Sequence, residues 1–282
     1  MAITINESNV AAVSIAAKVK RQPLLTAAHT QDGKVLLDRL IVEAGGTHAL
    51  HIGTGDLAWV QIIEGTAVLS HGSHGDTKDA LTHAHIVFLP PGFSGTLATP
   101  NGVILIYATV PNAARFDAAF TQSPPLFRIV DWTREPMLDS EHDARKRIYV
   151  VTPKLFGTKA IKGEMIIYPP GTQASNHHHE GAEHFMYVLK GKGTAWANEL
   201  PIPVRKGDVI YYDDRERHYL RAGNEEEMAF VEFFVPGEYK TIWAPGADIC
   251  TWTPTGRSIS GAKPVRDIAK HSSAGVASPQ DV

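Results

Sequence analysis

Short apolar runs separated by glycine and proline turns recur along this chain, and they fall into two groups. The first group contains runs such as KVLLDRLIVEAGG and LAWVQIIEGTAVL, and the second contains EMIIYPPG, HFMYVLKGKG and MAFVEFFVPG. Short runs rich in Val, Ile, Tyr and Phe and bounded by turn residues are typical of antiparallel strands in a sandwich or barrel. The sequence therefore predicts an all-β protein, and its 282 residues are enough for one or two domains.

The two groups of runs are copies of one another. When the sequence is shifted by 126 positions, Gly45 falls on Gly171 and His51 falls on His177. A repeat this long indicates two barrels of one type rather than a solenoid, whose repeats are roughly 20–50 residues long. We expect a first barrel over residues 1–125, a linker over 126–146, a second barrel over 147–254 and an extended tail over 255–282.

Charge and composition argue against several classes of partner. The net charge is −3 and the lysines and arginines are scattered, so no interface with nucleic acid or an anionic membrane is expected. The start of the chain lacks the pattern of a signal peptide, and no stretch reaches the roughly 18 apolar residues of a membrane span. The single cysteine, Cys250, can form neither an internal disulfide nor a cysteine cage for zinc. We expect a cytoplasmic protein.

Histidines concentrate in the stretch SNHHHEGAEHFMYVLKG, residues 175–191. On a strand, His177 and His179 point to one face and His178 points to the other. His184 follows a short turn and opens the next strand, and His218 arrives on a later strand after another turn. Imidazoles from neighbouring strands can converge inside a barrel, so this pattern indicates a site for a transition metal.

The residues around these histidines resemble the two sequence motifs of the cupin superfamily. The segment from Gly171 to Gly191 is similar to the first motif, G-x5-H-x-H-x4-E-x6-G. The segment from Gly207 to Asn224 is similar to the second, G-x5-P-x-G-x2-H followed by Asn. The resemblance spans residues 35–255 and implies a bicupin, with two tandem jelly-roll barrels. It also implies one divalent transition metal, held by His177, His179, His184 and His218.

The sequence departs from both cupin motifs. His184 stands where the first motif has Glu, so a site of three His and one Glu becomes a site of four His. A shorter spacing would instead make Glu183 the fourth ligand, although seven residues rather than six would then precede Gly191. In the second motif, Asp213 and Arg215 replace Pro and Gly.

The first half of the chain lacks most of the motif histidines. It keeps His51, but the positions that match the other three ligands hold Gly53, Ala58 and Gly95. We therefore expect the N-terminal barrel to be folded and metal-free, which leaves one metal per chain.

Other residues near the motifs have less specific interpretations. His178 is expected at the surface or behind the ligands. Glu232 lies in the apolar run FVEFFV, where an outward-facing or paired carboxylate is expected rather than a catalytic base. Trp196, Met186 and Leu220 are candidates for the wall of a pocket, and core packing explains them equally well.

The predicted ligand set limits the metal and the reaction. Imidazoles suit iron, copper, zinc and nickel, and a carboxylate ligand would add manganese. The resemblance to gentisate-dioxygenase-like bicupins implies Fe(II) with open positions where O2 and a chelating substrate bind together. We therefore expect an Fe(II) dioxygenase, forming a homo-oligomer, that cleaves a small aromatic hydroxy acid or a diketone-like compound.

Two other function classes remain open at this point. One is a metal-dependent hydrolase, isomerase or decarboxylase of a small metabolite, similar to ureidoglycine-aminohydrolase-like bicupins, although the Glu-x-His-x3-His spacing of that family is not matched here. The other is a bicupin that binds a small molecule without catalysis. The expected substrate is small, anionic and metal-chelating, and the fold alone does not decide the reaction.

Overall fold

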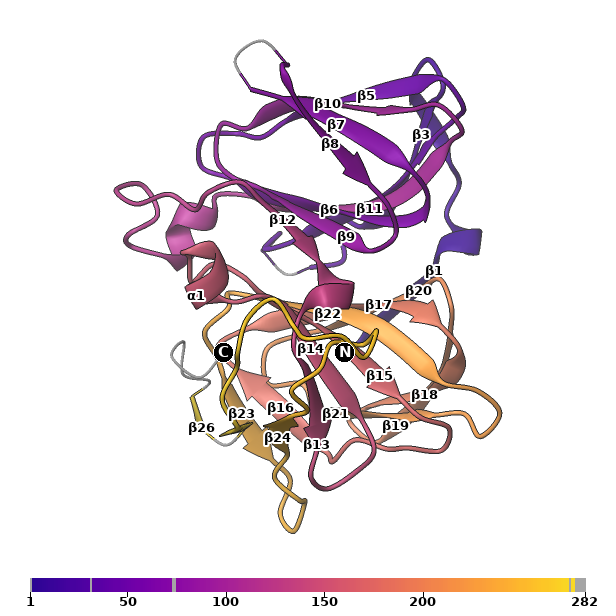
Figure 1. The fold of residues 1–282 in the computed structure, drawn as a ribbon. Coiled ribbons are helices and arrows are strands. Elements are labelled where there is room, and N and C mark those ends of the chain that lie inside the picture. The colour runs from indigo at the N-terminus through magenta and orange to yellow at the C-terminus, as the bar shows by residue number, and fades with distance from the viewer. Residues whose placement is uncertain (1, 31, 73–74, 274, 277–282) are drawn as a thin grey trace. The chain divides into compact units, whose positions relative to one another are not determined.

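The computed structural model describes residues 2–30, 32–72, 75–273 and 275–276, and the chain divides into two compact β units (Figure 1). The N-terminal unit contains Glu7–Asp131 and Phe156–Thr158. The C-terminal unit contains the chain start up to Asn6, then Trp132–Leu155, and the chain from Lys159 onward. Each unit has two sheets, as the prediction of two jelly-roll barrels requires. The helical elements of the described residues are short: η1 (Glu7–Asn9), η2 (Ala113–Phe116), η3 (Trp132–Arg134) and α1 (Pro153–Phe156).

In the N-terminal unit, a seven-stranded and a four-stranded antiparallel sheet enclose an apolar core. Leu40, Val60, Leu69 and Leu97, two from each sheet, are fully buried in that core. The larger sheet has the order β12 (Arg128–Asp131), β9 (His85–Leu89), β6 (Leu57–Gly65), β11 (Val103–Val110), β4 (Leu36–Val42), β3 (Val19–Leu25) and β2 (Val13–Ala16). The smaller sheet has the order β5 (Gly46–His51), β10 (Ser94–Thr99), β7 (Ala67–His71) and β8 (Thr77–Leu81).

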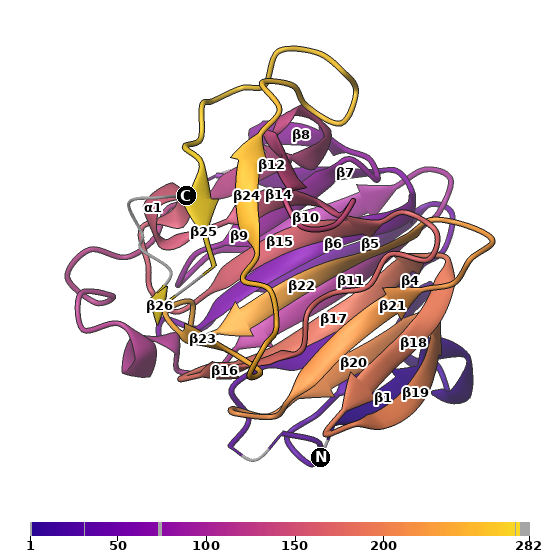
Figure 2. The same cartoon turned by 90° about the horizontal axis from the view of Figure 1, so that it is seen from below.

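In the C-terminal unit, a nine-stranded and a six-stranded sheet pack together through residues such as Met186, Ala195, Leu220 and Phe230. The larger sheet has the order β1 (Ile3–Asn6), β20 (Asp208–Tyr212), β17 (Glu183–Lys190), β22 (Met228–Val235), β15 (Lys162–Tyr168), β14 (Lys146–Val151), β13 (Met137–Ser140), β24 (Thr251–Pro254) and β25 (His271–Ser272) (Figure 2). The smaller sheet has the order β19 (Leu200–Arg205), β18 (Lys192–Ala197), β21 (His218–Ala222), β16 (His177–Glu180), β23 (Lys240–Trp243) and β26 (Gly275–Val276).

The structure divides the chain differently from the expected boundaries. The first strand, β1, belongs to the C-terminal unit, where the Asn6 amide donates to the Asp208 carboxylate at 2.6 Å. The expected linker contains β12 and β13, and the expected tail contains β25 and β26. Except for β13, these strands form sheet edges. Edge strands are only partly buried and their sequences are more polar. For this reason the sequence pattern of these segments resembles that of a loop.

Two glycines show that both units use the same turn. Gly65 and Gly191, which the 126-residue shift superimposes, have φ values of 81° and 78°. A Cβ atom would lie 2.2 Å from the Gly102 carbonyl oxygen in the first unit and 2.3 Å from the Glu227 carbonyl oxygen in the second. Both positions therefore require glycine for the same two reasons, backbone conformation and close approach of the neighbouring strand.

Candidate metal centre

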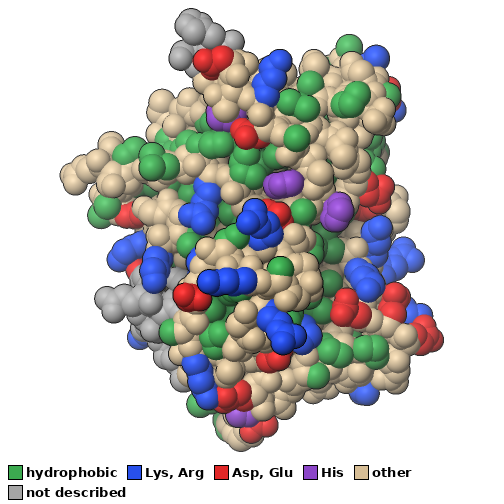
Figure 3. Space-filling view, viewed as in Figure 1, with side chains coloured by type: hydrophobic (Ala, Val, Ile, Leu, Met, Phe, Trp, Pro, Cys, Tyr) green, Lys and Arg blue, Asp and Glu red, His purple; other side chains and the backbone are tan. Residues whose placement is uncertain are grey.

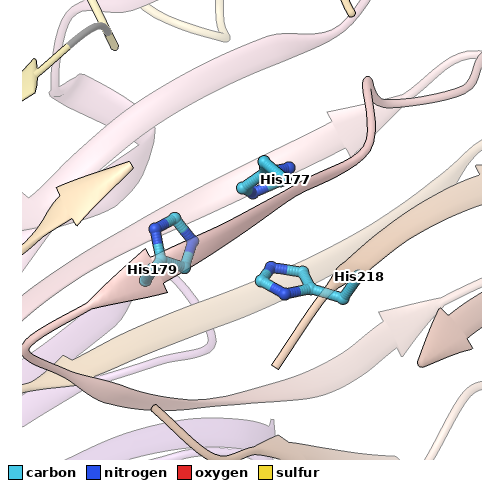
Figure 4. A group of neighbouring side chains, drawn as sticks. All are labelled: His177, His179 and His218. Carbon is cyan, nitrogen blue, oxygen red and sulfur yellow. The ribbon is translucent and has the colours of Figure 1, made fainter. Parts of the chain in front are cut away.

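Three of the predicted ligands lie together in the C-terminal unit. His177 and His179 share one face of β16, and His218 begins β21, which pairs with β16 at His177. Figure 4 shows the three rings around one shared space. Their ligand nitrogens all lie within 4.8 Å of one another. Because an ion such as zinc binds imidazole nitrogens at about 2.0–2.1 Å, these side chains can share one ion after small adjustments.

The fourth predicted ligand, His184, belongs to a second group that shares His179. This group also contains Glu232, and its three ligand atoms again lie within 4.8 Å of one another. The His184 ring centre is 5.0 Å from that of His179 and 4.6 Å from that of His218. The two groups therefore form one continuous array of four imidazoles and one carboxyl group.

Backbone carbonyls orient two of the imidazoles. The Nδ1 atom of His177 lies 2.8 Å from the Ser175 carbonyl oxygen, and Nδ1 of His218 lies 2.8 Å from the Glu216 carbonyl oxygen. A carbonyl only accepts, so the proton of each ring is on Nδ1 and the lone pair is on Nε2. Among the described residues, Nε2 of His218 has no hydrogen-bond partner although it is buried. A buried lone pair of this kind fits a metal ligand.

The imidazoles of the array are neutral at ordinary pH. Burial lowers the pKa of His177, His179 and His184 well below 6.5, and the neighbouring histidines lower it further. Burial lowers the pKa of His218 to about 4, against a smaller opposing effect of its hydrogen bond to Glu216. Neutral imidazole is the form that binds metal, so the array is ready to accept an ion without first losing protons.

Glu232 faces the inside of the barrel beside His184, so of the two arrangements expected from the sequence, outward-facing or paired, the outward-facing one is wrong. The side chain is 8% exposed, and its Oε1 atom lies 3.5 Å from Nε2 of His184. Burial raises its pKa well above 4.5, and the buried Glu164 directly opposite on β15 raises it further. The raised pKa favours the protonated form of this carboxyl group, whereas Arg147, Arg145 and Lys162 act in the opposite direction. The outward reading fails because β22 lies inside a large sheet and both of its faces are covered.

Two neighbours of the array point away from it. Glu183, the alternative fourth ligand, lies next to His184 on β17 and so on the opposite face, where its carboxylate accepts a hydrogen bond from the Tyr211 hydroxyl at 2.5 Å. His178 likewise lies on the opposite face of β16, and its Nε2 atom is 3.5 Å from the Glu180 carboxylate. Neither residue belongs to the two groups of ligand atoms.

A cavity of about 60 Å³ lies beside the histidines and is lined by His177, His179 and His218. Met186 and Leu220, two of the wall candidates from the sequence, form part of its apolar wall. Trp196, the third candidate, instead stacks on Tyr219 with ring centres 4.6 Å apart.

Charged residues that the sequence analysis did not single out line the opposite wall of this cavity. Arg147 on β14 forms an ion pair with Glu164 on β15, at 3.0 Å. Arg145, just before β14, pairs with Asp143 at 2.8 Å. Lys162 also lines this wall, and burial lowers its pKa to about 8. A signal was present in the sequence, because Lys162 and Glu164 stand at alternate positions of an otherwise apolar strand.

The C-terminal segment closes part of the cavity. His271 on β25 lines it, and its Nε2 atom lies 2.8 Å from the Tyr149 hydroxyl. The Trp252 indole on β24 donates to the Ser273 hydroxyl at 3.0 Å. The segment expected to be an extended tail thus contributes side chains to the wall of the site.

The N-terminal unit has no corresponding cluster among its described residues. His51, which matches His177, is exposed on β5 and lies 2.9 Å from the Ser94 hydroxyl. Ala58, which matches His184, is buried in an apolar core. Apolar side chains therefore fill the part of the N-terminal barrel that corresponds to the position of the imidazoles in the C-terminal barrel.

Comparisons with known proteins agree with this architecture. The family model described as "Cupin domain" matches residues 164–234. The oxalate-binding protein of Thermotoga maritima is 30% identical over 67 residues, which are 24% of this chain. That match spans 55% of the relative, about half its length.

Solved structures support the same fold over most of the chain. Oxalate decarboxylase of Bacillus subtilis has a TM-score of 0.66 and 13% identity, covering 85% of this chain and 78% of that one. The protein YlbA of E. coli has a TM-score of 0.65 and 15% identity, covering 83% of this chain and 90% of that one. Residues 164–234 of the C-terminal unit therefore match a cupin domain, and the two-unit β fold of the chain is similar to the fold of these solved structures, as its motifs predicted.

The surface carries mixed charges. On the face seen in Figure 3, Lys and Arg side chains lie among Asp and Glu side chains. Within the described ranges, no helix combines the length and the apolar character needed to cross a membrane.

Proposed function

We propose that this bicupin is a metal-dependent enzyme that acts on a small aliphatic anion of the oxalate type. The observation that carries the proposal is the array of neutral, buried imidazoles beside a small cavity whose opposite wall holds Arg147 and Lys162. Neutral ligands leave the charge of a bound cation uncancelled, so such a site attracts anions that chelate through two oxygens.

His177, His179 and His218 would hold the ion, and His184 would be a fourth ligand. The buried lone pair on Nε2 of His218 supports this assignment. A divalent ion bound there supplies a Lewis acid that binds and polarises the oxygens of a chelating substrate. The protein's own contribution is to hold the rings in a fixed tautomer through Ser175 and Glu216.

The size of the cavity favours an aliphatic substrate over an aromatic one. Its volume of about 60 Å³ is less than half of the roughly 150 Å³ of an engineered protein cavity that binds benzene. Two proteins similar to this chain are named for oxalate, one as a binding protein and one as a decarboxylase. Both observations support a short dicarboxylate or 2-oxo acid.

Glu232 is suited to donate a proton in this reaction. When one carboxylate of such a substrate leaves as CO2, the bond to the remaining carbon breaks and that carbon takes up a proton. Burial raises the pKa of Glu232, which favours its protonated form, and its carboxyl group lies within the array of ligand atoms, where it can supply this proton before solvent restores it. Decarboxylation is therefore the reaction class that we propose first.

An Fe(II) dioxygenase acting on a diketone-like compound is the second candidate, and the all-imidazole ligand set favours it. Imidazole suits iron, whereas carboxylate and carbonyl ligands suit manganese. A short diketone is closer to the size of the cavity than an aromatic hydroxy acid is, so the diketone is the dioxygenase substrate that we propose.

The two candidates differ in what they consume and release. We would load metal-free protein with Mn(II), Fe(II) or Zn(II), add oxalate, malonate or acetylacetone, and record CO2 release and O2 uptake. We expect CO2 from a dicarboxylate without net O2 uptake. O2 uptake with acetylacetone, in the Fe(II) form alone, would establish the second candidate instead. Tight binding of every anion without turnover would favour a binding protein.

The role of Glu232 is tested by Glu232→Gln, which keeps the shape and removes the acid. We expect kcat to fall about a hundredfold while metal content stays the same. The matched control is Glu226→Gln, a change to an exposed carboxylate in a turn, which should leave kcat unchanged.

A further inference from the structure

Lys162 is a buried cation that forms no ion pair with the described residues. It begins β15 and its side chain lines the cavity, yet the residue is only 4% exposed. Within the described part of the chain, its ammonium group has no hydrogen bond and no ion pair, and its close neighbours are two aromatic rings. The nitrogen lies 5.1 Å from the ring centre of Tyr149 and 5.2 Å from that of Tyr239.

The other charges of this wall are already matched. Arg145 pairs with Asp143, and Arg147 pairs with Glu164. The Glu232 carboxyl group lies beside His184, with its Oε1 atom 3.5 Å from the Nε2 atom of that ring. Among the described residues of this wall, the Lys162 ammonium is therefore the cation that no ion pair matches, and an unpaired buried ion is costly.

We propose that Lys162 binds a carboxylate of the substrate, so that the site selects dianions with one end at the histidines and the other at this ammonium group. The assignment rests on the proposed function for the end at the histidines, and on the geometry of the cavity for the end at Lys162. A buried lysine that pairs with its ligand rather than with the protein is a specificity determinant for that ligand.

The two ends are close enough for a short dicarboxylate. The Tyr239 ring is a neighbour of both ends, with its centre 5.2 Å from the Lys162 nitrogen and 4.8 Å from the centre of the His179 ring. The nitrogen and the imidazole are therefore separated by no more than these two distances together. A dicarboxylate of two or three carbons spans part of this gap, and a hydrogen bond at each end covers the rest at about 2.8 Å apiece.

The substitution Lys162→Met should change stability in opposite directions, depending on whether Lys162 has a structural role or a binding role. If the ammonium group held Tyr149 and Tyr239 in place, Lys162→Met would destabilise the fold. If it waits for an anion, replacing the unpaired charge with an apolar side chain of similar length should stabilise the empty protein. If Lys162→Met both stabilises the protein and weakens dianion binding, the function of Lys162 is to bind the ligand and not to stabilise the fold.

The test uses two probes that differ in charge. Oxalate carries two carboxylates, and oxamate replaces one of them with a neutral amide of similar shape. We would measure the Kd of both by calorimetry on full-length protein, metal-free and Mn(II)-loaded, for the wild type, Lys162→Met, Lys162→Arg and the control Lys159→Met. Lys159 is an exposed lysine of the same unit. Metal content and Tm are recorded for each protein.

We expect the wild type to prefer oxalate, and Lys162→Met to weaken oxalate binding about ten- to hundredfold with little change for oxamate, unchanged metal content and a raised Tm. Lys162→Arg should recover part of the preference, and Lys159→Met should match the wild type. Equal preference in the wild type and Lys162→Met overturns the proposal, as does a wild type without preference. Weak binding of both probes in the Mn(II) form, with the preference for oxalate intact in metal-free protein, would refute the proposed metal-dependent function but not the Lys162 subsite.

Discussion

At the scale of single residues, the partners of the histidine rings determine what the array can bind. His177 and His218 are oriented by backbone carbonyls, so their lone pairs depend on the path of the main chain and not on a neighbouring side chain. His179 is different, because its Nδ1 atom lies 3.3 Å from the Thr241 hydroxyl, which can both donate and accept. Of these three rings, His179 is thus the one whose orientation is most open to change by substitution.

The ligand assignment predicts which histidines hold the metal. His179→Ala should remove most of the bound metal, because His179 belongs to both groups of ligand atoms, and His177→Ala and His218→Ala should do so as well. His178→Ala should retain the metal, since that side chain lies on the other face of β16. Elemental analysis measures the metal, and circular dichroism checks that each variant is folded. Equal losses for His178→Ala and its neighbours would mean that the strand parity is wrong.

A second pair of variants separates the two candidates for the fourth ligand. Glu183→Gln should leave metal affinity within about twofold, because the carboxylate faces Tyr211 on the opposite side of β17. His184→Gln should weaken it about tenfold or more, the typical effect of a lost contribution to a metal site. Competition with a fluorescent chelator gives both affinities. The reverse order would move the ligand to Glu183.

Lys162 predicts a dependence of stability on pH. Burial lowers its pKa from 10.5 to about 8, and Arg147 lowers it further while Glu164 and Glu232 act in the opposite direction. Between pH 8 and 10.5 the unfolded chain holds a proton that the folded chain has released. The free energy of unfolding therefore rises with pH across this window. This gain in stability is lost again as pH falls through the window to 8, because the folded protein then holds Lys162 buried and charged.

The variant Lys162→Met removes this dependence. In metal-free protein at pH 7 it should be more stable than the wild type, by on the order of 2–3 kcal/mol, and the difference should shrink toward pH 10. Urea unfolding at pH 7, 8.5 and 10 measures it, with Lys159→Met as the control. A difference that stays constant with pH would show that Lys162 does not titrate in this range.

At the scale of strands, local alternation could be predicted from the sequence and strand neighbours could not. The shared face of His177 and His179 follows from parity within one short segment. The inward position of Glu232 depends on the strands beside β22, such as β15, where Glu164 lies directly opposite although it is 68 positions earlier in the chain. No periodicity within FVEFFV distinguishes an edge strand from an interior one, so the burial of both faces of β22 could not be inferred.

The pairing of β1 with β20 predicts a contribution of the chain start to the C-terminal unit. Deleting residues 2–6 removes four paired positions and the hydrogen bond from Asn6 to Asp208. We expect a loss of about 2–4 kcal/mol, at roughly 1 kcal/mol per hydrogen bond. The control Thr4→Ala changes an exposed side chain and keeps the strand. Metal release during urea unfolding reports on this unit, and an unchanged midpoint for the deletion would contradict the prediction.

At the scale of the whole molecule, two barrels of one fold have different interiors. The N-terminal core is apolar around Ala58, whereas the C-terminal core gives space to imidazoles and charged groups around His184. The repeat could be predicted from sequence because glycine turns recur at a fixed interval. The polar cavity could not, since its wall combines strands from the start, middle and end of the C-terminal unit.

This difference predicts the number of metal ions. Purified protein should contain close to one transition metal per chain, and His179→Ala should contain close to none. Elemental analysis against protein concentration from amino-acid analysis measures both values. Two equivalents per chain in the wild type would mean that the N-terminal unit also binds metal.

The position of β1 affects how the chain can fold during its synthesis. Asn6 and Asp208 are 202 positions apart, so at about 5–20 residues per second the ribosome needs roughly 10–40 s to make the second after the first. Throughout that interval the first strand has left the ribosome without its partner, and its free N–H and C=O groups can pair with other nascent chains on the same messenger. The unit that is translated last therefore depends on a segment that is translated first, and slower translation lengthens the time in which that segment can be captured by a neighbour.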